Sequence, residues 1–240
     1  MKRVMSAHQP NFLPYLGFFH KMLNSDVFVI RDEVQFVERD WHHRNRIRVQ
    51  GEDQDGQPKS NWLTVPVKKE NIQIKDILIK TEAKYKNVPW NVYILRQIRS
   101  NYEKSPFFGR YFPKIEEIFL SKKERLIDLN LDLIIYLRES FEIGTKIVIA
   151  SELDGYEKSG DPVLDLVELC KVTGANTYLS GPGGKNYLKS LAPFERNGIE
   201  VIFHEFVGAT YAQRFPGFVP YLSSVDALFN VGGLPAQLRK

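Results

Sequence analysis

Short strand-like runs separated by a helical pattern open the chain. Residues 3–7 (RVMSA) and 26–32 (DVFVIRD) have the length and apolar content of buried strands, and residues 15–24 between them carry apolar positions at helical spacing. Such runs are typical of parallel strands that are covered on both faces of a sheet. The pattern therefore predicts an opening βαβ unit with a compact crossover.

The C-terminal part of the chain repeats this alternation of strands and helices. One of its helices has Asp161 as a predicted N-cap, Pro162 at the first helical position and Gly174 just past the end, which are favoured residues at those places. Alternation of this kind indicates a parallel sheet with helices on both faces. The predicted strands are 145–151, 176–180 and 199–206.

The middle of the chain has two other patterns. Over 33–81, short alternating runs are split by turn-like stretches, which indicates antiparallel hairpins. Over 86–141, apolar positions recur at helical spacing. We therefore predict one α/β domain over 1–240, with a parallel, nucleotide-binding sheet of the HUP/Rossmann-like kind, a hairpin insertion at 33–81 and a helical segment at 86–141.

Composition narrows the class of protein only a little. Apolar residues make up 43% of the chain, charged residues 26%, and no apolar run approaches the roughly 20 residues of a membrane helix. Because we find no apolar leader segment and only one cysteine, we expect a cytoplasmic protein without disulfides. The net charge of +4 fits a nucleotide, a phosphosugar or nucleic acid, but 29 acidic against 33 basic residues discriminate weakly between them.

The first candidate motif is HQPNFLPYLG, at residues 8–17. It follows the first predicted strand, and ligands of open parallel sheets bind beyond the carboxyl ends of the strands. His8, Gln9 and Asn11 would then face a ligand, while Gly17 permits close approach and the prolines stiffen the loop. The competing interpretation is a capped turn around a core histidine.

The second candidate motif is SGPGGKNY, at residues 180–187. A glycine-rich turn between a strand and a helix offers backbone amides to an anion, and Lys185 adds a positive charge. The spacing differs from both the Walker and the dinucleotide-binding glycine patterns. The sequence thus predicts a phosphate or carboxylate site, with an ordinary glycine turn as the alternative.

The third candidate stretch is basic and aromatic, at residues 32–48. Asp32 ends the second predicted strand, so it belongs to the same sheet edge as the first motif. Trp41, Asn45 and Arg46 offer stacking and hydrogen bonds to an anion. A solvated edge strand is the competing interpretation.

Metal and thiol chemistry are not expected. Adjacent His42 and His43 would point to opposite faces of a regular strand, so they cannot share one metal ion. The chain lacks the usual metal and nucleophile-elbow motifs, and Cys170 lies in a helical pattern. His204 is most simply a core histidine, while residues 210–215 and Asp226 either complete a pocket or hold the C-terminal helix.

Five stretches together resemble the WbqC-like protein family: HQPNFLPYLGFFHKM, DVFVIRDEVQFVERDWHHRNRIR, WLTVPV, YLSGPGGKNYL and LSSVDALFNVG. The resemblance runs nearly end to end and in order. Members occur among bacterial genes for surface polysaccharide (O-antigen, lipopolysaccharide) assembly, which implies transfer of an acyl or aminoacyl group, including glycyl, to the amino group of a nucleotide-linked amino sugar. The motif residues that the resemblance carries over are His8, Gln9, Pro10, Gly17, Asp32, Gln35, Asn45, Arg46, Ser180, Gly181, Gly184 and Tyr187.

The opening also looks distantly like the HxGH entrance of nucleotidyl-transferring α/β enzymes, whose histidines hold nucleotide phosphates. Here His8 and Gly17 are present, but Phe18 follows the glycine where those enzymes have histidine. This departure argues against nucleotidyl transfer itself. It leaves open an ATP-dependent ligase, in which ATP activates a carboxylate and an amine then attacks.

Our expected catalytic roles follow from the needs of acyl transfer, which are a base for the amine proton and donors for the oxyanion. His8 would be the base, Asp32 would orient an amine or histidine, and Asn45 and Arg46 would stabilise developing charge. The remaining expected residues would bind substrate. They are Gln9, Asn11, Tyr15, Gly17, Gln35, Trp41, Ser180, Gly181, Gly183, Gly184, Lys185 and Tyr187.

The expected partner is a nucleotide-linked amino sugar or another phosphate-bearing small molecule, bound where loops near positions 8, 45 and 181 converge. No cofactor is required with certainty, and ATP with magnesium or an acyl donor are the open choices. A non-catalytic nucleotide-sugar binder is the remaining alternative. Nucleic acid is the weaker expectation, and a homodimer is left open.

Overall fold

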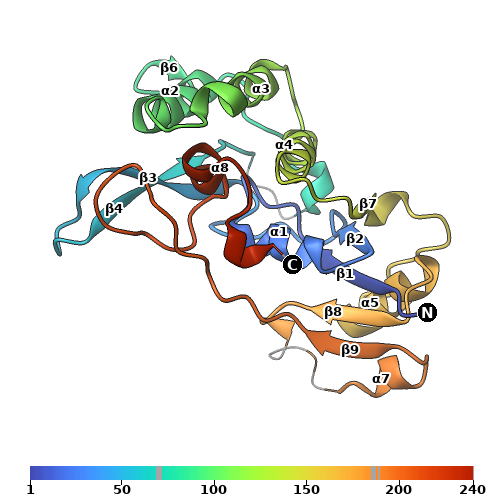
Figure 1. Cartoon of the computed structure of the whole chain (residues 1–240). Coiled ribbons are helices and arrows are strands. Elements are labelled where there is room, and N and C mark those ends of the chain that lie inside the picture. The colour runs from blue at the N-terminus through green and yellow to red at the C-terminus, as the bar shows by residue number, and fades with distance from the viewer. Residues whose placement is uncertain (69–71, 185–187, 189, 240) are drawn as a thin grey trace. The chain divides into compact units, whose positions relative to one another are not determined.

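A five-stranded parallel sheet is the centre of one part of the molecule (Figure 1). Its strands lie in the order β7-β2-β1-β8-β9, and all four neighbouring pairs are parallel. This computed structural model confirms the predicted parallel sheet and the opening βαβ unit. The strands are β1 (Val4–His8), β2 (Val27–Ile30), β7 (Lys146–Ile149), β8 (Thr177–Ser180) and β9 (Glu200–Phe203).

The chain forms two compact units, and the structure describes residues 1–68, 72–184, 188 and 190–239. The sheet unit comprises residues 1–9, 17–34 and 143–207. The hairpin unit comprises residues 10–16, 35–142 and 208–240. The single domain over 1–240, with its insertion at 33–81 and helical segment at 86–141, stays a prediction.

Two helices cover opposite faces of the sheet. Side chains alternate between the faces along a strand, so Val27 and Val29 face one way and Phe28 the other. Both valines pack in one core cluster with residues of α5 (Pro162–Val172). The ring of Phe28 instead contacts Phe18 of α1 (Leu16–Leu23), with centroids 4.9 Å apart. Burial on both faces explains why β2 is apolar at every position.

The predicted ends of α5 are confirmed. The Asp161 carboxylate accepts hydrogen bonds from the backbone N–H groups of Val163 at 2.7 Å and Leu164 at 3.1 Å, which satisfies two amides that the helix cannot. Gly174 follows the helix with φ of +67°, a conformation that favours glycine. Cys170 is buried in the core cluster, and burial raises the pKa of its thiol to about 12.

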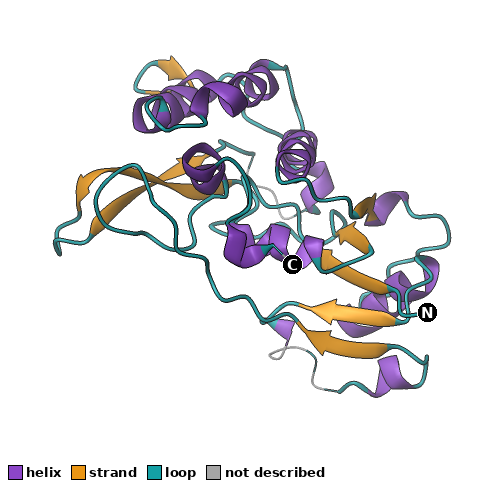
Figure 2. Ribbon diagram, in the orientation of Figure 1, coloured by secondary structure: helices purple, strands orange, loops and turns teal. Residues whose placement is uncertain are grey.

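The hairpin unit contains the antiparallel elements of the predicted fold class (Figure 2). Strands β3 (Arg44–Glu52) and β4 (Pro58–Thr64) pair with Arg46 opposite Trp62. A register shift lies between Arg48 and Glu52. A second, two-residue pair consists of β5 (Lys84–Tyr85) and β6 (Val88–Pro89).

Three described helices of the hairpin unit lie within residues 86–141, and α8 lies nearer the C-terminus. α3 begins at Phe108 and contains Pro113 within the helix. Pro113 lacks only the hydrogen bond to the carbonyl of residue 109, and the buried aromatic face of the helix outweighs that loss. The helices are α2 (Trp90–Tyr102), α3 (Phe108–Leu120), α4 (Leu126–Ser140) and α8 (Val225–Val231).

The remaining helical elements are short. The longest described helix, α4, has 15 residues, and no helix of the described chain has the length and apolar content needed to cross a bilayer. The short elements are η1 (Ile74–Asp76), η2 (Ala150–Glu152), α7 (Ala192–Glu195) and η3 (Ala236–Leu238).

Candidate functional site

The order of strands in the sheet reverses between β1 and β8. From β1 the chain builds outward through β2 and β7 on one side, then returns to build β8 and β9 on the other. In open parallel sheets, the crevice beyond the carboxyl ends at such a reversal is the usual ligand site. His8 ends β1 and Ser180 ends β8, so the first residues of the first two sequence motifs lie at this edge of the sheet unit.

The two central strands pair only over their first halves. The β1–β8 ladder contains Val4↔Thr177 and Met5↔Tyr178, whereas the β1–β2 ladder runs on to His8↔Ile30. The backbone beyond Met5 is therefore paired on one side only. Beyond Met5↔Tyr178 the carboxyl ends of β1 and β8 are not paired with each other. This unpaired stretch, called the gap below, lies at the point where topology places a ligand.

A hydrogen bond determines the tautomer of the neutral His8 ring. Its Nδ1 lies 3.0 Å from the carbonyl oxygen of Gln9, and because a carbonyl can only accept, Nδ1 carries the hydrogen. In the neutral ring Nε2 then has the lone pair that a general base needs. The edge of the ring packs against Phe18, with centroids 4.9 Å apart. His8 and Gln9 are both half-buried.

The glycine turn after β8 is tightly built. The N–H of Gly184 donates to the carbonyl of Gly181 at 2.8 Å. A Cβ atom at Gly184 would lie 1.8 Å from Ser180 Oγ, so this position accepts only glycine without rearrangement. Gly183 is exposed. Lys185 and Tyr187 lie outside the described residues, so the predicted anion site at this turn stays a prediction.

Asp32 joins the ends of β2 and β7. Its carboxylate accepts hydrogen bonds from the Ser151 N–H at 3.0 Å and the Ser151 hydroxyl at 2.5 Å. Both bonds hold the first turn after β7, and Asp32 is buried. Asp32 thus positions the turn after β7 at the sheet edge. Its predicted contact with a substrate amine or histidine stays a prediction.

A buried ionic cluster beside Asp32 was missed from the sequence. Glu33 Oε1 accepts from Arg31 Nε and, at 3.2 Å, from the Tyr156 hydroxyl. Arg31 also lies 3.5 Å from Asp165, whose other oxygen accepts from Ser159. Burial raises the pKa of Tyr156, so its hydroxyl keeps its proton and donates. Three consecutive charged residues directly after a buried strand were the available signal.

Two histidines of the sheet unit are hydrogen-bonded to each other. His20 Nδ1 of α1 lies 2.7 Å from His204 Nε2, just beyond β9, and Phe206 stacks against His204. In this hydrogen bond one of the two nitrogens must donate and the other must accept. His204 is buried and bonded as expected of a core histidine. Within the described ranges, no cluster of three or more His, Cys, Asp or Glu side chains could hold a metal ion.

Lys21 is the second feature that the sequence reasoning missed. It is 4% exposed, and its ammonium donates to the carbonyl of Ala7 at 2.8 Å. Ala7 lies in the part of β1 that β8 leaves unpaired. Burial lowers the pKa of Lys21 to about 7. The signal was its place three residues after Phe18 on the apolar face of a helix.

The predicted residues of the hairpin unit hold local structure. The Asn45 amide donates to the carbonyl of Leu13 at 2.7 Å and of Phe12 at 3.3 Å, and its oxygen accepts from the Arg46 N–H. Asn45 therefore holds the loop that contains buried Asn11. Catalytic roles for Asn45 and Arg46 stay predictions.

Two further predicted residues of the hairpin unit make backbone contacts. Tyr15 forms an isolated bridge with Ser223, and burial, together with the neighbouring Tyr221, raises the pKa of its hydroxyl. Gln35 donates from its side chain to the Ile72 carbonyl at 3.2 Å. Their predicted contacts with substrate stay predictions.

An exposed aromatic and cationic face lies on the β3–β4 hairpin. Trp41 and Trp62 are both partly exposed, with ring centroids 5.3 Å apart. The guanidinium carbons of Arg44 and Arg46 lie 4.3 Å and 5.7 Å from the Trp62 centroid. Contacts of this kind stabilise the hairpin face. The two guanidinium groups also give this face positive charge.

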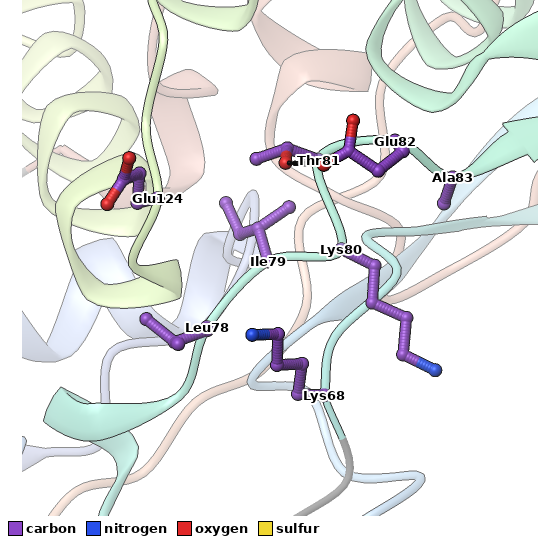
Figure 3. A pocket seen from close by; sticks show the side chains of 8 residues that line it. All are labelled: Lys68, Leu78, Ile79, Lys80, Thr81, Glu82, Ala83 and Glu124. Carbon is purple, nitrogen blue, oxygen red and sulfur yellow. Dashed lines mark hydrogen bonds between the residues drawn. The ribbon is translucent and has the colours of Figure 1, made fainter.

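Among the open cavities of the hairpin unit are two that differ in size and lining. The larger, of about 650 Å³, has four charged side chains on its rim, whose ends point in different directions (Figure 3). The smaller, of about 350 Å³, includes Arg39, His43 and Arg44 in its lining. The residues around the larger cavity are Lys68, Leu78, Ile79, Lys80, Thr81, Glu82, Ala83 and Glu124, none of which belongs to the predicted site.

Of the three predicted loops, the structure brings two to one edge. His8 and Gly181 follow neighbouring strands of the sheet unit. Asn45 belongs to the hairpin unit. The convergence of all three on one cavity stays a prediction.

Comparison with known proteins places the chain in a family. The uncharacterized protein Rv1507c of Mycobacterium tuberculosis (strain ATCC 25618 / H37Rv) is 30% identical over 246 residues, which cover 100% of this chain and 98% of that protein. No solved structure matches the chain. The family model described as "WbqC-like protein family" matches residues 9–237. The chain therefore belongs to the WbqC-like protein family, as its motifs indicated.

Proposed function

We propose that the protein is an enzyme of bacterial surface polysaccharide (O-antigen) biosynthesis that transfers an acyl or aminoacyl group to the amino group of a nucleotide-linked amino sugar. The observation that carries the proposal is the gap between the carboxyl ends of β1 and β8, with His8 on one side and the Ser180–Gly184 turn on the other. This is the edge at which parallel sheets bind nucleotides. Family membership is compatible with an enzyme.

His8 is suited to the role of base. Its Nδ1 donates to the Gln9 carbonyl, which orients the ring, and in the neutral form the lone pair of a base is on Nε2. In the proposed step the amine nitrogen attacks the acyl carbonyl carbon and His8 takes the amine proton. As the C–N bond forms, the bond to the donor's leaving group breaks. With a thioester donor the departing thiolate then receives the proton from His8, so the products are an amide and a thiol.

The other residues have supporting roles in the proposal. Asp32 holds the adjacent strand end through Ser151 and so keeps the edge in shape. The glycine turn offers space and backbone groups to a phosphate.

A ligand screen tests the function directly. Thermal unfolding is measured with nucleotide-linked amino sugars, with their N-acetylated forms, with acyl thioesters and with ATP–magnesium, because a ligand that binds the folded state raises the melting temperature. We expect stabilisation by an amino sugar nucleotide and by a thioester. Incubation of both should give a product heavier by the acyl group in mass spectrometry, with loss of the free amine.

Two outcomes would replace the proposal. Release of AMP or ADP that depends on both an amine and a free acid would show an ATP-dependent ligase. Stabilisation by the nucleotide sugar without turnover, across all donors tested, would show a non-catalytic binder. Binding of oligonucleotides with a steep dependence on salt would instead show a nucleic-acid partner.

A further inference from the structure

Lys21 is buried in a way that is unusual for lysine. It lies on the inward face of α1, where its neighbours along that face, Phe18 and Met22, are 1% and 0% exposed. Lysine is almost never fully buried unless its charge is paired. The position therefore needs a physical explanation other than chance packing.

The side chain reaches the gap between β1 and β8. The β1–β8 ladder stops at Met5↔Tyr178, and two residues further along β1 the Ala7 carbonyl accepts from Lys21 Nζ at 2.8 Å. The ammonium thus lies between the carboxyl ends of the two central strands. It occupies the place where a nucleotide-binding sheet holds its ligand.

The glycine turn lies close to this ammonium. Lys21 Nζ lies 3.6 Å from the position that a Cβ atom at Gly181 would take. The φ of Gly181 is outside the left-handed region, so its backbone does not require glycine. Because position 181 has no side chain, no Cβ atom contacts Nζ from this side.

The charge of Lys21 is not balanced by the protein. An ammonium has three donor hydrogens, and the Ala7 carbonyl takes one. Among the residues that the structure describes, no carboxylate lies within 4.0 Å of Lys21 Nζ. A buried charge without a partner is costly, and an anion that entered the gap would supply the missing partner.

We propose that Lys21 is a binding residue that holds an anionic group of the ligand, a phosphate or a carboxylate, in the gap between β1 and β8 beside Gly181. The inference rests on the proposed use of this edge by a phosphate-bearing ligand. The bound anion and the ammonium form a charge-assisted hydrogen bond in a dry setting, where such bonds are strong. Burial lowers the pKa of the free side chain to about 7, so above neutral pH the anion binds together with a proton.

Anion titrations test the proposal. Pyrophosphate, inorganic phosphate and acetate are each titrated calorimetrically into the wild-type protein and into Lys21→Met. We expect Lys21→Met to weaken the preferred anion at least about tenfold, as loss of one charged hydrogen bond predicts. Preference for pyrophosphate identifies a phosphate ligand, and preference for acetate a carboxylate. Titration at pH 8 in buffers of different ionisation enthalpy should show proton uptake by the wild type.

Matched variants distinguish anion binding at a specific site from general electrostatic attraction to the protein. Lys171→Met removes one lysine from the exposed face of α5 and should leave anion affinity unchanged. Gly181→Ala places a methyl group 3.6 Å from Nζ without backbone strain and should weaken the anion while Lys21 is intact. Thermal melts confirm that each variant folds, and Lys21→Met should melt at an equal or higher temperature because it removes a buried charge.

Three results would overturn the inference. They are equal anion affinity in wild type and Lys21→Met, equal losses in Lys21→Met and Lys171→Met, and absence of anion binding to the wild type. The titrations need no acyl donor. If anion binding depends on Lys21 but the protein transfers no acyl group, only the proposed function is wrong. If the protein transfers an acyl group but anion binding does not depend on Lys21, only this inference is wrong.

Discussion

The Tyr102 hydroxyl donates a 2.7 Å hydrogen bond to the Asp226 carboxylate, and both side chains are fully buried in the hairpin unit. Tyr211 and Gln213 donate to the other carboxylate oxygen at 2.9 Å and 3.0 Å. Of the two roles that the sequence left open for Asp226 and residues 210–215, the contacts favour holding the C-terminal helix. The carboxylate joins α2 and the 211–213 segment to α8.

Asp226→Asn should destabilise the protein by about 2 kcal/mol, because the amide cannot accept all three hydrogen bonds and its NH₂ group faces donors. Tyr102→Phe removes a single bond and should cost about 1 kcal/mol. The free energy of unfolding from urea denaturation measures both. An Asp226→Asn variant as stable as the wild type would show that the network contributes little.

Lys21 should give the protein a characteristic dependence of stability on pH. Its pKa is about 7 in the folded protein against an ordinary value of 10.5, so between these values the unfolded chain binds more protons. Stability from this group therefore rises with pH across that window, by up to about 1.4 kcal/mol per pH unit. Urea denaturation from pH 7 to 9.5 measures the slope.

Lys21→Met is the control for this slope, because other groups titrate in the same range. Burial raises the pKa of Cys170 to about 12, and this contribution has the opposite sign above pH 9. The difference between wild type and variant cancels such groups and isolates the lysine. A difference that stays constant with pH would show that Lys21 keeps an ordinary pKa.

A side chain at position 184 should destabilise the protein. In Gly184→Ala the new Cβ would meet Ser180 Oγ at 1.8 Å, and the forced shift should cost about 1–3 kcal/mol. Gly183→Ala is the matched control, because a Cβ there meets nothing within 4 Å. Combining Gly184→Ala with Ser180→Ala removes the shortest contact and should recover part of the loss. Equal melting temperatures for the two glycine variants would contradict the turn geometry.

Glu33 should contribute far more to the free energy of unfolding than an exposed carboxylate that pairs with a similar cation. Glu33→Gln leaves Arg31 with Asp165 alone in a buried setting and should cost about 3 kcal/mol. Glu168→Gln breaks the exposed pair with Lys171 and should cost less than about 1 kcal/mol. Guanidinium denaturation compares them. Similar losses in the two variants would mean that the Arg31 cluster is solvated in solution.

His8→Gln should lower the rate of acyl transfer about 10²- to 10⁴-fold, because glutamine fills similar space but cannot accept the amine proton as a base. Affinity for the nucleotide sugar should change little. His43→Gln is the control, since His43 bonds the Val65 carbonyl in the hairpin unit. Steady-state kinetics separate the two effects, and full turnover by His8→Gln would end the assignment of the base.

The sequence predicted those parts of the fold that local patterns encode. The all-apolar β2 and the Asp161 cap of α5 are examples, because burial and capping leave a signature in consecutive residues. The position of β8 beside β1 has no such signature. It depends on pairing between residues that are about 170 positions apart, which periodicity does not record.

The candidate site was predictable in part for the same reason. His8 follows one predicted strand and Ser180 ends another, so the rule for ligand sites of parallel sheets placed both at one edge. Lys21 was passed over because a lysine in a helix is ordinarily on the surface, and only the three-dimensional path of α1 turns it inward. The tight contact that requires glycine at position 184 likewise exists only once the turn has formed.

The buried thiol of Cys170 has a practical consequence. With a pKa of about 12 and no exposed surface, it holds almost no thiolate at neutral pH and should not react with maleimides in the folded protein. A cysteine introduced at an exposed position can therefore carry a fluorophore or spin label while the native residue remains in place. Ligand binding can then be followed spectroscopically in an otherwise unaltered chain.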